Sequence, residues 1–210
     1  MEDILDVYQG SYDARFPLVC MDESSKQLLA DVREPVPVEP GQVARYDSEY
    51  QRHGTRNLFV AFAPVQGWRD VCVTERRTKQ DWAHYMQQLV DVHFPDAERI
   101  TVVLDNLNTH TLASLYATFP PSEARRMARK VDLHYTPKHG SWSGTPWVLA
   151  EIELSVLSRQ CLNRRIADEA TLHQEVAAWV AARNTQATTV AWRFTTDDAR
   201  IKLKRLYPQL

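Results

Sequence analysis

The sequence lacks several features that would place it at once in a common class of protein. Its 210 residues include only three cysteines, Cys20, Cys72 and Cys161, and no C-x-x-C pair. This argues against a disulfide framework or a zinc knuckle and favours a reducing cytoplasm. No apolar run approaches the roughly 20 residues that a membrane helix needs. The acidic start MEDILDVYQG has no apolar segment of the kind found in signal peptides.

The chain also lacks a large excess of charge of either sign. Its net charge is −2 at pH 7, so no overall basic surplus indicates a nucleic-acid partner. Local basic clusters at 125–130, 164–165 and 200–205 are still compatible with a surface that faces phosphate. A Gly-rich phosphate loop, a G-x-S-x-G motif and an H-E-x-x-H motif are all missing. Any catalytic chemistry must therefore come from acids and histidines outside these motifs.

Hydrophobic residues make up 44% of the chain, which is enough to form the buried core of a folded domain. Its first half reads as strands, with a hairpin formed by Phe16–Ser24 and the segment KQLLADVRE, and with an exposed loop at 35–55. A helical pattern at 78–94 with Thr78 as N-cap follows, then a strand at 100–104 and further helices. This order predicts an α/β domain in which a mixed sheet carries helices on its faces.

Two aspartates follow apolar strand patterns. Asp22 comes after LVCM and Asp105 after ITVVL, and the latter opens the polar cluster DNLNTH with Asn106 and His110. Ligands in open sheets commonly bind beyond strand ends, and carboxylates there suit Mg²⁺ or Mn²⁺. Each aspartate is also compatible with a plain turn or helix-capping role, which is common at strand ends. The pattern alone leaves both interpretations open.

Four segments together resemble the catalytic domain of bacterial insertion-sequence transposases related to the mariner elements. They are CMDESSKQLLAD, VVLDNLNTH, HYTPKHGSW and AEIELSVLSRQCLNRR, and they occur in the same order as in that group. These enzymes belong to the DDE superfamily of endonucleases. The resemblance implies an RNase H-like fold, an α/β mixed β-sheet with helices on both faces. It extends from about residue 15 to the C-terminus, so we expect residues 1–210 to form a single catalytic domain.

The resemblance also implies a site. Asp22, Asp105 and Glu151 match the three catalytic acids, which would bind two divalent ions, Mg²⁺ or Mn²⁺. Four further residues would support the acids or contact DNA: Asn106, His110, Lys138 and His139. The expected partners are the DNA of the element ends and target, and a second copy of the chain in a synaptic complex. The expected location is the bacterial cytoplasm, on the nucleoid when DNA is bound, with no membrane association.

Glu151 and Glu153 open the same predicted helix. Two residues apart on a helix, they point about 200° apart, so only one can face a given site. Either acid would also suit the positive end of the helix dipole. Position in the family motif selects Glu151 as the third acid, and we expect Glu153 to lie at the surface or behind the site.

The sequence departs from the family in two ways. The link Ser143–Leu149 is longer than usual, and Val148 stands where relatives have Asn. Such an insertion beside Glu151 would displace it, and a shift of about 1 Å can cost about a hundredfold in rate. We also expect the N-terminal helix-turn-helix modules of full-length relatives to be absent.

These departures leave two alternatives to an active transposase domain. One is an inactive or truncated remnant that binds DNA or a transposase partner without catalysis. The other is a hydrolase of another class, such as a phosphatase or glycosidase, that uses Asp22 and Asp105.

Overall fold

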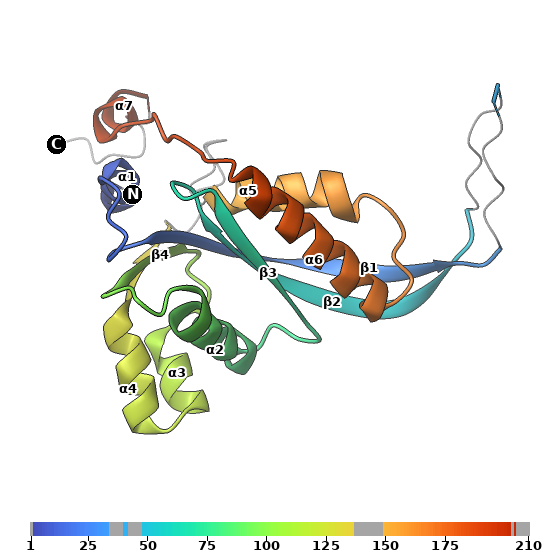
Figure 1. Ribbon diagram of the computed structural model, residues 1–210, viewed down its shortest axis with the longest axis horizontal. Coiled ribbons are helices and arrows are strands. Elements are labelled where there is room, and N and C mark those ends of the chain that lie inside the picture. The colour runs from blue at the N-terminus through green and yellow to red at the C-terminus, as the bar shows by residue number, and fades with distance from the viewer. Residues whose placement is uncertain (1, 34–39, 42–47, 137–148, 203, 205–210) are drawn as a thin grey trace.

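The computed structural model describes residues 2–33, 40–41, 48–136, 149–202 and 204. A single mixed sheet with strand order β3-β2-β1-β4-β5 forms its centre (Figure 1). The strands are β1 (Leu18–Asp31), β2 (Tyr50–Ala63), β3 (Trp68–Thr74), β4 (Ile100–Leu104) and β5 (Val131–Tyr135). The first three pair antiparallel, whereas β4 and β5 join β1 in parallel.

Helices cover both faces of this sheet, as predicted (Figure 1). On one face α2, α3 and α4 close a large apolar core, and on the other α5 and α6 close a second. The helices are α1 (Glu2–Gln9), α2 (Lys79–Gln88), α3 (Leu112–Thr118), α4 (Pro121–Lys130), α5 (Leu149–Leu157), α6 (Glu169–Gln186) and α7 (Thr196–Lys202). Two π-helical segments, η1 (Leu89–His93) and η3 (Ser158–Leu162), extend α2 and α5. Within the described ranges no helix is long and apolar enough to cross a bilayer.

The start of α2 confirms the N-cap that the sequence predicts. The Asp81 amide donates to the Thr78 hydroxyl (3.3 Å), and the Thr78 amide donates to the Asp81 carboxylate (2.7 Å). This reciprocal capping box satisfies two amides that the helix itself cannot. The junction between β3 and α2 is thereby fixed beside the site described below.

The predicted hairpin within residues 16–34 is wrong, because β1 continues without a turn from Leu18 to Asp31. It pairs along its length with β2, which begins at Tyr50 inside the segment predicted as a loop. The polar residues that suggested a turn have partners across the strands: the Ser25 hydroxyl donates to the Asn57 side chain (2.7 Å). A polar stretch can remain a strand when its partner strand and solvent satisfy it.

The terminal helices α1 and α7 contact each other beside the sheet (Figure 1). The Arg200 guanidinium donates to both carboxylate oxygens of Glu2 (2.8 and 3.0 Å), and the Thr196 hydroxyl donates to Asp6 (2.7 Å). Leu5 of α1 and Ala199 of α7 are fully buried between them. The sequence patterns predicted no helix for the segment that forms α1.

Candidate active site

Asp22 lies within a strand, not at the end of one as predicted. The parallel pairing of β1 with β4 ends at Cys20 and Val103, while β1 continues against β2 with Asp22 opposite Val60. Extending the register beyond Cys20 and Val103 brings Asp22 level with Asp105, the residue that follows β4. The two aspartates therefore meet where the parallel half of the sheet ends, although only β4 ends there.

Glu151 approaches the same place from a helix. It lies in the first turn of α5, directly after Leu149 and Ala150, which are buried against the sheet. Glu151 itself is exposed. The sequence-predicted third acid is thus held at the rim of the site by two apolar neighbours.

The three acids influence one another electrostatically. Burial, followed by the negative charges of Asp105, Glu151 and Glu23, raises the pKa of Asp22 to about 7, against the opposing effect of the Glu23 amide. Partial burial and the charge of Asp105 raise the pKa of Glu151 as well. Carboxylates that disfavour ionisation near one another form a site that a cation would stabilise.

The donor set fits Mg²⁺ or Mn²⁺, because carboxylate oxygens are the ligands that these hard ions prefer. In the part of the chain that the structure covers, however, no three His, Cys, Asp or Glu side chains are already close enough to hold a metal ion.

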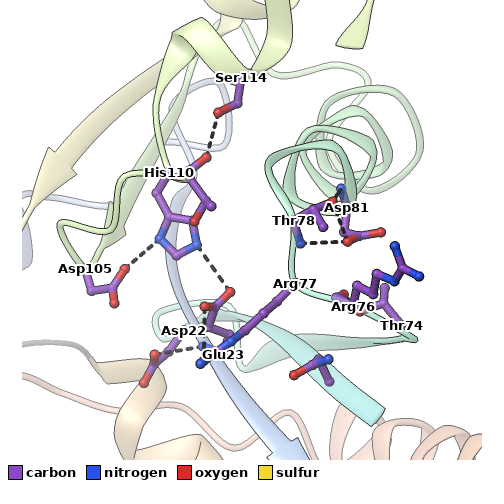
Figure 2. Close-up of polar contacts among 12 residues, drawn as sticks. Asp22, Glu23, Thr74, Arg76, Arg77, Thr78, Asp81, Asp105, His110 and Ser114 are labelled. Atoms are coloured by element: carbon purple, nitrogen blue, oxygen red, sulfur yellow. Dashed lines mark hydrogen bonds and ion pairs between the residues drawn. The ribbon is translucent and has the colours of Figure 1, made fainter. Parts of the chain in front are cut away.

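His110 lies between two carboxylates (Figure 2). Its Nδ1 is 2.6 Å from Asp105 Oδ1 and its Nε2 is 3.4 Å from Glu23 Oε2. Burial favours the neutral ring, but the hydrogen bonds and charges of both acids outweigh it and raise the pKa of His110 to about 9. At neutral pH the imidazolium therefore donates to Asp105 and Glu23 at once.

The loop that carries Asp105 and His110 is tied to its surroundings. The Tyr135 hydroxyl on β5 donates to the His110 carbonyl (2.7 Å), and the Ser114 hydroxyl donates to the Thr109 carbonyl (2.7 Å). The Trp82 ring of α2 stacks on the imidazole, with centroids 5.8 Å apart. Backbone and ring contacts thus fix the orientation of His110.

Sequence reasoning missed Glu23 and Arg77. Glu23 follows Asp22 on the strand, so its side chain points to the opposite face, where it is nearly buried and meets His110. The Arg77 guanidinium, half exposed at the β3–α2 junction, is 3.5 Å from the Glu23 carboxylate (Figure 2). The position of Glu23 next to Asp22 in CMDE is the one sequence feature that could have indicated its role. Arg77 lies far from both acids in the sequence, so no local pattern indicates it.

The remaining predicted site residues are less informative. Asn106 follows Asp105 and is exposed. Lys138 and His139 lie outside the described residues, as does 143–148, which includes the altered part of the link to α5.

Of the two positions expected for Glu153, the surface is excluded, because its side chain is buried. Its side chain is 2% exposed, and its carboxylate is 2.8 Å from Nε of the fully buried Arg69. The Arg183 guanidinium of α6 donates to the same oxygen (3.3 Å). Because Glu153 is buried against Arg69, the rotation of α5 about its own axis is fixed. Glu151 points about 200° away from Glu153 around that axis and therefore lies outside the core.

Comparison with known proteins gives the family. The family model of the DDE superfamily endonucleases matches residues 17–173. No curated protein matches the sequence. Among solved structures, a crystal structure of the Mos1 mariner paired-end complex with Mn is 15% identical, with a TM-score of 0.55 over 89% of this chain and 55% of that one. The Mos1 strand transfer complex is 16% identical, with a TM-score of 0.54 over 89% and 54%.

This likeness shows the fold, which is RNase H-like, and the chain spans little more than half the length of the Mos1 chains. The family match covers β1 to β5 and α5, and it includes Asp22, Asp105 and Glu151. The chain belongs to the DDE superfamily of endonucleases.

Proposed function

We propose that this chain is a transposase catalytic domain that cleaves DNA and transfers strands at the ends of an insertion sequence. The observation that supports the proposal is that Asp22, Asp105 and Glu151 lie near enough to one another for the charges of Asp105 and Glu151 to raise the pKa of Asp22. The raised pKa of Asp22 supports it, because acids that disfavour one another's charge fit a cation-binding role.

In this proposal Asp22, Asp105 and Glu151 hold two Mg²⁺ or Mn²⁺ ions. Such ions, when bound, activate a water or a DNA 3′-hydroxyl and stabilise the leaving oxygen at phosphorus. His110 keeps one oxygen of Asp105 oriented through its 2.6 Å contact. Asn106, Lys138 and His139 lie within or beside the family motifs and would contact DNA.

The proposed partners are DNA and a second copy of the chain, in the bacterial cytoplasm. Solved Mos1 structures, described as a paired-end complex with Mn and a strand transfer complex, support this chemistry for the relative. We further propose that residues 1–210 act as one catalytic unit, because α1 and α7 pack beside the sheet that carries the acids.

The test is nicking of supercoiled and linear DNA in Mn²⁺ by the wild-type chain and by Asp105→Asn and Glu151→Gln. We expect the wild type to nick and both variants to lose activity by at least about a hundredfold, since each removes a charged ligand at nearly constant size. Asp132→Asn, a change on the neighbouring strand β5, is the matched control. Equal nicking by all four proteins would exclude the proposal.

The inactive remnant makes a different prediction for the same proteins. A remnant would bind DNA equally with and without Mn²⁺, and calorimetry would detect no metal binding. Heat of Mn²⁺ binding that is lost in Glu151→Gln would contradict it, even if no DNA substrate tried were cleaved.

A further inference from the structure

The residues two positions before each acid are buried together. Cys20 precedes Asp22, Val103 precedes Asp105 and Leu149 precedes Glu151 by two positions. All three are no more than 1% exposed and belong to one apolar cluster. The three acids come from β1, the loop after β4, and α5, and each of them thus follows a residue of one buried apolar layer.

The other side of this layer is closed by α1. Ile4 and Tyr8 belong to the same cluster, with Ile4 fully buried and Tyr8 8% exposed. We call Ile4, Tyr8, Cys20, Val103 and Leu149 the support layer. The family match begins at residue 17, so α1 lies outside it and yet packs against the buried residues that precede the acids.

The Tyr8 hydroxyl lies inside the support layer. The Tyr8 hydroxyl oxygen accepts a hydrogen bond from the backbone amide of Leu149 (3.4 Å) and another from the Cys20 thiol (3.7 Å). It therefore joins the strand that carries Asp22 to the helix that carries Glu151, in each case two residues from the acid. A phenylalanine would supply the same apolar contact but no acceptor for these donors.

Two features argue that this arrangement is more than core packing. The Leu149 amide is among the first amides of α5, which lack a partner within the helix, so the Tyr8 oxygen satisfies a donor that is otherwise costly to bury. The position of α1 is also fixed from outside, by the bidentate Arg200–Glu2 contact and by Trp192, whose ring lies 5.2 Å from that of Tyr8.

We propose that Tyr8 is a positioning residue that sets the separation between Asp22 and Glu151. Through Tyr8, α1 therefore influences metal binding at the site. The inference rests on the proposed function for the identity of the bound ion. The contact of Tyr8 with β1 and α5 does not depend on that identity. Removing a group that orients metal ligands typically changes metal affinity by about 10–100-fold.

The experiment compares Tyr8→Phe with Tyr85→Phe in the full chain. Tyr85 is also buried, and its hydroxyl donates to a backbone carbonyl, that of Asp70 (3.3 Å), but it lies in the core on the α2 face and away from the support layer. Each change removes one hydroxyl from a buried tyrosine. Calorimetry with Mn²⁺ gives the dissociation constant, and thermal unfolding in chelator gives the stability of the metal-free chain.

We expect Tyr8→Phe to weaken Mn²⁺ binding by about tenfold or more and Tyr85→Phe to leave it within twofold. Unchanged Mn²⁺ affinity in Tyr8→Phe would overturn the inference. So would an equal loss in both variants, because that would reflect general destabilisation.

A second measurement keeps the inference testable without metal. Amide exchange followed residue by residue should be faster at Leu149 and Glu151 in Tyr8→Phe, and unchanged there in Tyr85→Phe. Unaltered exchange at both positions would refute the role of Tyr8. If the wild type binds no Mn²⁺, the proposed function fails, and the exchange data still decide whether Tyr8 holds α5.

Discussion

Replacing Asp22 by Asn should stabilise the metal-free protein at alkaline pH while removing a proposed ligand. In the folded chain the pKa of Asp22 is raised from its ordinary value of 3.8 to about 7, chiefly by burial and then by the neighbouring acids. Between these two values the folded state keeps a proton that the unfolded chain has released. Raising the pH through this window therefore destabilises the folded wild type, and Asn has no charge to develop.

The magnitude follows from the size of the window. From pH 5 to the folded pKa of about 7 is two pH units, and at about 1.36 kcal/mol per unit this gives about 2.7 kcal/mol. Above pH 7 Asp22 is ionised in both the folded and the unfolded wild type, so the difference in stability between Asp22→Asn and wild type no longer changes with pH. The stability of Asp22→Asn relative to wild type should thus increase by about 2–3 kcal/mol between pH 5 and pH 8.

Urea unfolding in chelator at pH 5, 6, 7 and 8 measures this difference. His110 is unchanged in both proteins, so its own pH dependence cancels to first order in the comparison. Asp132→Asn, at a half-exposed side chain on β5, controls for the substitution itself. A difference that stays constant from pH 5 to pH 8 would refute the reasoning, because it would mean that Asp22 ionises alike in both states.

Three further predictions test the surroundings of the site. Glu153→Ala should cost about 3–5 kcal/mol in urea unfolding, because it leaves the fully buried Arg69 without its carboxylate; a loss below about 1 kcal/mol would show that the pair is dispensable. His110→Ala should lower Mn²⁺-dependent nicking by about 10–100-fold, and wild-type rates would show that Asp105 needs no such support. Thr78→Ala should cost about 1 kcal/mol by removing one half of the capping box with Asp81, and unchanged thermal unfolding would contradict this.

The sequence predicted best the features that depend on near neighbours. The strand at 100–104 and the cap at Thr78 are confirmed, because a β-branched run and a capping box are read within a few residues. The meeting of Asp22 with Asp105 was expected from strand ends, although Asp22 proves to lie inside a strand. Choosing Glu151 over Glu153 depended on the family resemblance, since helix geometry separates the two acids without saying which one faces the site.

The features that were missed depend on distant partners. The burial of Glu153 depends on Arg69, which is 84 positions earlier, and nothing near Glu153 in sequence indicates that cation. The continuity of β1 through polar residues depends on β2, whose pairing begins beyond a long connection. Tyr8 lies in a segment with no family motif, so only the folded chain shows its contacts with Cys20 and Leu149.

The placement of Asp22 inside β1 also has a mechanical consequence. Asp22 is paired across to Val60 in the middle of a 14-residue strand, whereas Asp105 follows the end of a strand and Glu151 is in the first turn of a helix. Displacing Asp22 would break the backbone pairing of β1 with β2, whereas Asp105 and the start of α5 are held through side-chain contacts with His110 and Tyr8. In the proposed metal site Asp22 would therefore be the acid that the backbone of the sheet holds in place, and a side-chain substitution elsewhere in the site would shift Asp105 or Glu151 rather than Asp22.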